Sequence, residues 1–275
     1  MPKPWRKLLW TPPRYPDNYT DSSFLSDLLR NPSTPTYNLY ALVADSTNIT
    51  QHLCIVAIFV SVFCGIYRGE LNAGAVGGFG AVTSVIGWYY FGNGEGKNTL
   101  KSALVILSAL LSLSPLLKSL TISTASDSIW ALSSWLFLVN VFFHAYSPSP
   151  VTPLSSSLST NAAIMASVVL ASRLATIFEV FFLLLFSIQL FALFPLFRKR
   201  LFKTSFILHF SLTGVCFVSA VLGLQIWVSG SIASMFVVGM IGVVLLAPFW
   251  FLRLQRWKDE IRGPWDTARP VFRVG

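Results

Sequence analysis

The chain has 275 residues, of which 54% are hydrophobic and only 11% are charged. Soluble domains carry about 25% charged residues, so this composition excludes an ordinary soluble domain and indicates a membrane protein. The net charge of +9 could suggest nucleic-acid binding, but the basic residues lie at the ends of apolar runs. That placement is typical of residues that set membrane topology and contact lipid headgroups, so we expect no nucleic-acid partner.

Residues 1–51 are predicted to form a cytosolic arm, because prolines recur along it and exclude long helices. Within the arm, apolar positions between Tyr19 and Arg30 recur at helical spacing, which predicts a short amphipathic helix. The arm has no apolar core followed by a small-residue cleavage site, so we do not expect a cleaved signal peptide. The first membrane span must therefore direct insertion.

Residues 52–252 are predicted to form a transmembrane domain of about eight helices, and residues 253–275 a basic tail. The second span contains Gly74 and Gly78, at a small-xxx-small spacing that lets two helix backbones approach closely. The predicted spans are Leu53–Tyr67, Ala73–Phe91, Leu100–Leu120, Ile129–Phe143, two short spans within Asn161–Phe197, Phe206–Val228 and Ile232–Leu252.

The stretch Asn161–Phe197 decides which side of the membrane every later segment faces. As one helix it would be roughly 55 Å long, whereas a bilayer core is about 30 Å thick. Arg173 and Glu179 lie in its middle, where each charge would cost about 2.5–3.5 kcal/mol at mid-membrane. We therefore predict two short spans joined by a tight turn near these two residues.

The distribution of positive charge supports this eight-span arrangement. With the N-terminus in the cytosol, the cytosolic segments hold 17 of the 20 Lys and Arg residues. A single span over 161–197 would move most of these charges to the other side. The positive-inside rule thus predicts an all-α polytopic protein with both termini in the cytosol.

Polar signatures in both ends and in the loops resemble those of the PIG-C family. The resemblance covers about Pro4 to Ala268, and the loop between Gly96 and Leu100 is shorter than the family pattern implies. The matching segments, in chain order, are Trp5–Leu9, Tyr15–Asp21 with Phe24 and Leu25, Gly94–Gly96, Leu100–Leu104, Ser114–Thr121, Ser156–Ser159 with Asn161, Leu170–Leu174, Ile188–Pro195, Arg253–Gln255 and Gly263–Asp266.

This resemblance implies a subunit of the complex that transfers N-acetylglucosamine from UDP-N-acetylglucosamine to phosphatidylinositol, the first step of glycosylphosphatidylinositol anchor synthesis. It implies residence in the endoplasmic reticulum membrane and a separate catalytic subunit of the PIG-A type. Phosphatidylinositol is the expected lipid partner. We expect no catalytic, cofactor-binding or metal-binding residues in this chain.

Two other functions remain open. A lipid or solute transporter would be favoured by inverted repeats, and no convincing internal repeat is present. A membrane-embedded glycosyltransferase would be favoured by an acid in the first non-cytosolic loop, where Glu70 lies. That loop is only a few residues long and Arg68 is close by, so we interpret Glu70 as an interfacial charge.

Five residues are candidate contacts to lipid or partner subunits. Arg173 could hold an inositol phosphate, because a guanidinium forks onto phosphate oxygens, but it could also mark a turn or pair with Glu179. Lys118 could bind lipid, although an interfacial pair with Asp127 is the simpler interpretation. Trp265 and Asp266 follow Gly263-Pro264 and suit a protein contact.

The three histidines show no pattern that predicts a site. His52, His144 and His209 lie near the ends of separate spans, without metal-ligand spacing. We interpret them as residues at the membrane interface.

Overall fold

The computed structural model describes residues 29–31, 37–91, 105, 108–112, 114–116, 119, 124–146 and 153–262. The chain divides into two compact units, of which the first comprises Met1–Asn38 with Phe249–Gly275 and the second comprises Leu39–Pro248. The described residues are almost entirely helical, apart from two strands of two residues each in the first unit. The predicted all-α class is confirmed.

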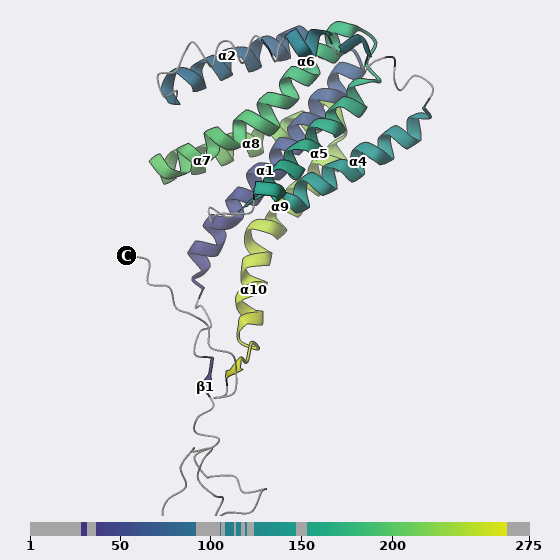
Figure 1. Cartoon of the computed structure of the whole chain (residues 1–275). Coiled ribbons are helices and arrows are strands. Elements are labelled where there is room, and N and C mark those ends of the chain that lie inside the picture. Colours follow the sequence, from purple (N-terminus) through teal and green to yellow (C-terminus); the bar gives the residue numbers. More distant parts are fainter. Residues whose placement is uncertain are drawn as a thin grey trace, which may run out of the picture. The chain divides into compact units, whose positions relative to one another are not determined.

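The second unit is a bundle of apolar helices (Figure 1). Two of the long helices each contain a π-helical turn: α6, η1 and α7 form one continuous helix, and α9, η2 and α10 form another. The last of these passes from the second unit into the first. The elements are α1 (Leu39–Tyr67), α2 (Ala73–Phe91), α4 (Ser126–Phe143), α5 (Pro153–Ala171), α6 (Ile177–Ile188), η1 (Gln189–Leu193), α7 (Phe194–Thr204), α8 (Phe206–Trp227), α9 (Gly230–Ile241), η2 (Gly242–Leu246) and α10 (Ala247–Gln255).

Five of the described helices are long and apolar enough to cross a membrane, which makes this a multi-pass membrane protein. Two shorter apolar helices, Ala73–Gly87 and Ser157–Ala171, match the predicted second and fifth spans. The predicted third span, Leu100–Leu120, lies mostly outside the described residues; its described parts, 108–112 and 114–116, are helical. The five long helices are Leu39–Tyr67, Ser126–Phe143, Ile177–Phe202, Phe206–Trp227 and Gly230–Gln255.

The first helix begins earlier than its predicted span. α1 starts at Leu39, shortly after Pro35, and thus reaches into residues that we predicted to be an irregular arm. Most side chains of its polar run Ser46–His52 are buried against other helices. The exclusion of a long helix from this part of the arm was wrong, because Pro35, the last of the prolines on which it rested, precedes α1.

The predicted hairpin in the middle of the chain is confirmed. α5 ends at Ala171 and α6 begins at Ile177, with Arg173 in the turn between them. Thr176 caps α6: its hydroxyl accepts from the Glu179 backbone N–H at 3.2 Å, and the Glu179 carboxylate accepts from the Thr176 N–H at 2.9 Å. This reciprocal capping satisfies backbone donors at the point where the chain re-enters the apolar bundle.

α1 is the helix around which the second unit packs. It contacts α8 along its length and also touches α4, α6 and both π-helical turns. Phe59 is fully buried and lies with its ring centroid 5.8 Å from that of Phe137 and 5.4 Å from that of Phe191. The core therefore joins the first helix to α4 and to η1, whose Phe191 follows Phe59 by more than a hundred residues.

Glycines let α2 pack closely against the long helix that starts with α6 (Figure 1). A Cβ atom at Gly77 would collide with the ring of Phe182, and one at Gly80 would collide with the side chain of Gln189. A Cβ at Gly78 would meet nothing within 4 Å. The predicted close approach is therefore present, but the helix face that makes it carries Gly77 and Gly80 and not Gly78.

The two strands tie the beginning of the first unit to its end. β1 (Leu29–Arg30) pairs antiparallel with β2 (Ile261–Arg262), so the predicted amphipathic helix is wrong for its last two residues; the rest of it lies outside the described residues. Asn31 extends the pairing, since its N–H donates to the Glu260 carbonyl at 2.7 Å.

The glycine contacts predict a difference between two adjacent substitutions on α2. Gly77→Leu forces a side chain into the ring of Phe182, and such overpacking costs about 1–3 kcal/mol. Gly78→Leu enters open space and gains the same helix propensity. We expect the melting temperature in detergent to fall for Gly77→Leu and to stay near wild type for Gly78→Leu. Equal melting temperatures would contradict the observed packing.

Candidate functional site

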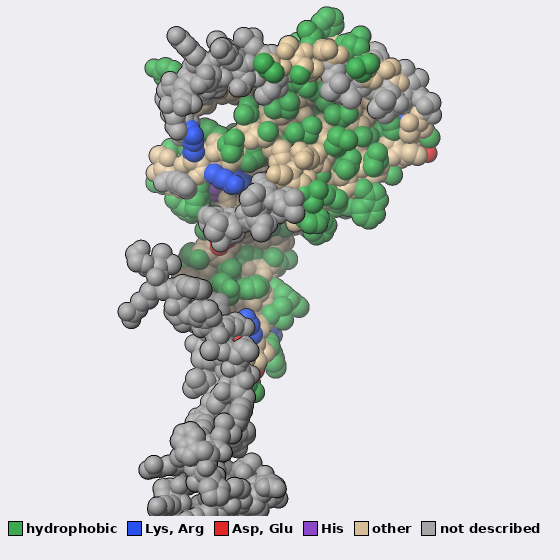
Figure 2. Space-filling view, in the orientation of Figure 1, with side chains coloured by type: hydrophobic (Ala, Val, Ile, Leu, Met, Phe, Trp, Pro, Cys, Tyr) green, Lys and Arg blue, Asp and Glu red, His purple; other side chains and the backbone are tan. Residues whose placement is uncertain are grey.

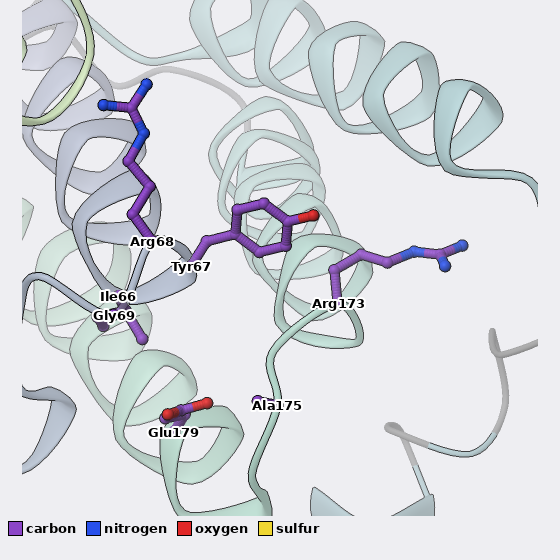
Figure 3. Close-up of a pocket in the computed structure, with 7 residues that line it drawn as sticks. All are labelled: Ile66, Tyr67, Arg68, Gly69, Arg173, Ala175 and Glu179. Atoms are coloured by element: carbon purple, nitrogen blue, oxygen red, sulfur yellow. The ribbon is translucent and has the colours of Figure 1, made fainter.

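Two of the predicted contact residues line a cavity at the end of the bundle where α1 and α5 terminate (Figure 3). The cavity has a volume of about 450 Å³. It is formed by the last turn of α1 and the turn between α5 and α6. Its lining residues are Ile66, Tyr67, Arg68, Gly69, Arg173, Ala175 and Glu179.

The charged groups of this cavity do not converge on a common point. Figure 3 shows the guanidinium groups of Arg68 and Arg173 directed away from each other and from Glu179. Arg173 donates a hydrogen bond to the carbonyl of Thr124, and the Glu179 carboxylate caps α6. The arrangement favours the structural interpretation of both residues, in which they hold the turn between α5 and α6.

The structure does not describe the other three residues that we predicted to contact lipid or partner subunits. Lys118, Trp265 and Asp266 lie outside the described residues, so their roles stay predictions. Asp127, the expected neighbour of Lys118, lies in the first turn of α4. Its carboxylate there suits the positive end of the helix dipole.

A second cluster, absent from the sequence predictions, lies on the polar run of α1. Asn48, Gln51 and His52 are all buried, although each carries groups that need hydrogen-bond partners. Buried polar groups without partners cost several kcal/mol in an apolar environment, so these side chains indicate specific contacts with neighbouring helices. Two sets of contacts involve this run, in which Gln51 and His52 bond through their side chains and Asn48 through its backbone carbonyl.

The first set surrounds Arg198 of α7, which is only 4% exposed. One terminal nitrogen of its guanidinium donates to the Asn48 carbonyl at 3.0 Å, and the other lies 3.2 Å from Nε2 of His144. Arginine has no acceptor, so His144 Nε2 must accept this hydrogen bond and cannot carry a proton. The ring of His144 is therefore neutral.

Asn140 of α4 continues this network into α1 and α5. Its Nδ2 donates to both the carbonyl and the hydroxyl of Ser159, each at 2.9 Å. Its Oδ1 must then be the acceptor for Nε2 of His52, 2.9 Å away. Because Asn140 is 1% exposed, it is an internal bridge between three helices.

The rings of His52 and His144 lie in contact. They stack with their centroids 3.8 Å apart and an angle of 12° between the ring planes. The ring of Tyr146 meets both of them edge-on, at 5.8 Å and 5.0 Å. Two protonated imidazoles would repel at this separation, which agrees with the neutral state that the Arg198 contact requires.

Burial shifts the pKa values of His144 and Tyr146, which lie just after the end of α4. Burial lowers the pKa of His144 from 6.5 to about 2, and the neighbouring His52, Arg198 and Lys199 add to this effect. Burial raises the pKa of the Tyr146 phenol to about 12, although Arg198 opposes this shift. Its hydroxyl stays protonated and donates to the Val141 carbonyl at 2.7 Å.

The second set of contacts joins α1 to α8. Nε2 of His209 lies 3.1 Å from the Thr47 hydroxyl, and Nε2 of Gln51 lies 2.7 Å from the Thr213 hydroxyl. Gln51 also donates to the His209 carbonyl at 3.1 Å. Oε1 of Gln51 and Nδ1 of His209 have no hydrogen-bond partner among the described residues. These contacts fix the rotation of α8 against α1.

The interpretation of the histidines as separate residues was wrong for two of them. His52 and His209 are fully buried, and His52 and His144 form one stacked pair. The signal available in the sequence was the density of polar residues at 46–52 next to an otherwise apolar helix. No group of three His, Cys, Asp or Glu in the described part of the chain is arranged to hold a metal ion.

The bridge made by Asn140 predicts a loss of stability when its amide is removed. Asn140→Leu keeps the side-chain size but removes the only described side-chain acceptor of His52 and the two hydrogen bonds that the amide donates to Ser159, which costs about 1–3 kcal/mol. Ser134→Ala on the same helix is the control, because Ser134 is exposed and bonds only to its own helix at Trp130. We expect a lower melting temperature for Asn140→Leu alone. A shift of the same size in both variants would argue against the bridge.

The lowered pKa of His144 predicts that acid destabilises the protein. The unfolded chain binds a proton at this residue below about pH 6.5, whereas the folded chain does not until about pH 2. Stability is therefore full above pH 6.5 and falls with decreasing pH by up to about 1.4 kcal/mol for each pH unit. We expect melting temperatures measured between pH 7.5 and 5.5 to fall less in His144→Gln than in wild type. Parallel curves would show that His144 is not held neutral.

Comparison with known proteins identifies the relatives of this chain. A family model described as GPI2, phosphatidylinositol N-acetylglucosaminyltransferase, matches residues 5–266. The chain is 45% identical to the phosphatidylinositol N-acetylglucosaminyltransferase GPI2 subunit of Schizosaccharomyces pombe, over 98% of this chain and 88% of the relative. It is 36% identical to a phosphatidylinositol N-acetylglucosaminyltransferase subunit from Homo sapiens, over 96% of this chain and 92% of the relative.

A more distant relative also matches along its full length. The GPI2 subunit of the Saccharomyces cerevisiae transferase is 29% identical, over 98% of both chains. No solved structure matches this chain.

Proposed function

The chain belongs to the GPI2 family of phosphatidylinositol N-acetylglucosaminyltransferase subunits, and we propose that it is the corresponding membrane subunit of that transferase complex. The observation that carries the proposal is the match over nearly the whole chain, including both ends. The complex transfers N-acetylglucosamine to phosphatidylinositol in the first step of glycosylphosphatidylinositol anchor synthesis. The family resemblance inferred from the polar signatures is confirmed.

We propose that this subunit supports the reaction without performing the chemistry. Glycosyl transfer needs acid–base or metal-ligand groups at the reacting atoms. The cluster around Arg198 consists, in its described members, of a guanidinium and neutral side chains. Such a cluster is suited to holding helices and anions, and the catalytic groups would belong to a PIG-A-type partner subunit.

The proposed location is the endoplasmic reticulum membrane with both termini in the cytosol. The β1–β2 pair supports a common side for residues 29–31 and 259–262. The excess of Lys and Arg in the predicted cytosolic segments supports the cytosol as that side. On this topology the basic end of α7 and the tail face the compartment that contains the nucleotide sugar.

The arm and tail are the proposed contact with the catalytic subunit. The family model extends to residue 266, so Trp265 and Asp266 lie inside the matched region. A tryptophan supplies a large rigid apolar surface and an adjacent acid supplies a charge for register, as at many protein interfaces. Neither residue is needed to keep apolar helices in a bilayer.

Replacing these two residues tests the proposed assembly role. We expect Trp265→Ala with Asp266→Ala to reduce co-purification of the catalytic subunit about tenfold, as loss of an interface anchor of about 1.4 kcal/mol or more would do. Membrane insertion and expression should stay at the wild-type level, and transferase activity with labelled UDP-N-acetylglucosamine should fall in parallel.

Trp257→Ala is the matched control, because Trp257 is an exposed tryptophan of the same tail. It should leave co-purification unchanged. Wild-type recovery of the partner by the double variant would remove Trp265 and Asp266 from the interface. Recovery of the wild-type chain without any glycosyltransferase would overturn the proposed function itself.

A further inference from the structure

Arg198 carries a buried positive charge that no acid in the described residues neutralises. Its two hydrogen-bonded partners in those residues, the Asn48 carbonyl and His144 Nε2, are neutral acceptors. Asp45, the acid nearest to this cluster along α1, is exposed and forms no ion pair among the described residues. Leaving a buried charge uncompensated costs several kcal/mol, so the site favours an anion.

The position of Arg198 along the bundle corresponds to a lipid headgroup layer. It bonds to α1 at Asn48, and the opposite end of the same helix is marked by Arg68, which follows Tyr67 directly. The twenty residues from Asn48 to Arg68 rise by about 30 Å, which is the thickness of a bilayer hydrocarbon core. The guanidinium therefore lies at the depth where phospholipid phosphates of one leaflet lie.

The surroundings of Arg198 carry further positive charge that attracts anions. Lys199 and Arg200 follow it on α7 and are exposed. Figure 2 shows basic side chains gathered beside a histidine at this end of the bundle. On the other side, Ala145 and Tyr146 are only partly buried, so a short non-helical segment and not a full helix borders the cluster.

A guanidinium offers five N–H donors, and two of the nitrogens of Arg198 have acceptors among the described residues. The planar fork of arginine fits two phosphate oxygens at once, and a buried pair of this kind is both strong and selective. We propose that Arg198, positioned by Asn48 and His144, binds the phosphodiester group of an anionic phospholipid. This inference deepens the proposed contact with phosphatidylinositol, and it is tested on the isolated chain.

The proposal predicts that stabilisation by lipid depends on Arg198. Arg198→Met removes a buried charge but also leaves Nε2 of His144 without its donor, so the quantity compared is the shift that lipid causes in each protein. Added phosphatidylinositol in mixed micelles should raise the melting temperature of wild type but not of Arg198→Met. A purely structural arginine would give the same lipid-induced shift in both proteins, and that result would overturn the proposal.

Measuring lipid binding directly distinguishes the contribution of the forked guanidinium of Arg198 from that of its positive charge. We expect Arg198→Met to weaken binding of labelled phosphatidylinositol to the purified chain at least about tenfold, the loss of a charge-assisted pair. Arg198→Lys keeps the charge but not the fork, and it should weaken binding to an intermediate degree. Lys199→Gln removes one charge from an exposed neighbour and is the matched control, expected to bind within about twofold of wild type. Equal weakening by Lys199→Gln and Arg198→Met would show general attraction to a basic surface and would reject the site.

The source of the phosphate is distinguished by the choice of probe. Phosphatidylinositol and phosphatidylserine should both stabilise wild type, while diacylglycerol, which lacks the phosphodiester, should not. An equal response to diacylglycerol would reject a phosphate site, and an equal response to inorganic phosphate at matched concentration would reject a lipid ligand. Because these measurements need no other subunit, their failure would leave the assembly role untouched, and failed co-purification would leave the lipid site untouched.

Discussion

The polar run Ser46–His52 of α1 is the constraint on which the rest of the bundle depends. Apolar contacts between helices in a membrane have little directional preference, because lipid tails satisfy an apolar side chain equally well. Polar side chains in the same place must meet particular partners. Asn140 and His209 bond to side chains of the run on α1, and Arg198 bonds to its backbone at Asn48. These contacts specify how α4, α8 and α7 are rotated against α1.

The same network explains why the helices are held by more specific contacts at one end of the bundle than at the other. At the Arg173 end, charged groups diverge and mainly complete turns and caps. At the Arg198 end, a cation, two stacked imidazoles and an amide share one buried region. For a subunit that works beside a lipid substrate, this end combines a fixed helix arrangement with an excess of positive charge.

The sequence predicted those features that depend on local patterns. The length of the stretch Asn161–Phe197 and its two central charges located the turn at Arg173, because one helix of that length cannot fit a bilayer core. Apolar runs located most spans. The start of α1 was missed because the recurring prolines end at Pro35 and do not exclude a helix between that residue and residue 51. Helices far along the chain cover Asn48, Gln51 and His52, which no local pattern shows. The contact between His52 and His144 follows only from the packing of α1 against α4, which no local pattern encodes.

The pairing of β1 with β2 has a consequence for how the protein is made. Leu29 and Arg30 leave the ribosome early, but their partners Arg262 and Ile261 are synthesised more than two hundred residues later. At about 5–20 residues per second, the arm waits on the order of 10 to 50 s for its other strand. Throughout this interval the membrane helices between them are inserted one after another. Pairing of β1 with β2 therefore becomes possible only after the last span has been synthesised. Until then the edge of β1 can pair with strands of other chains.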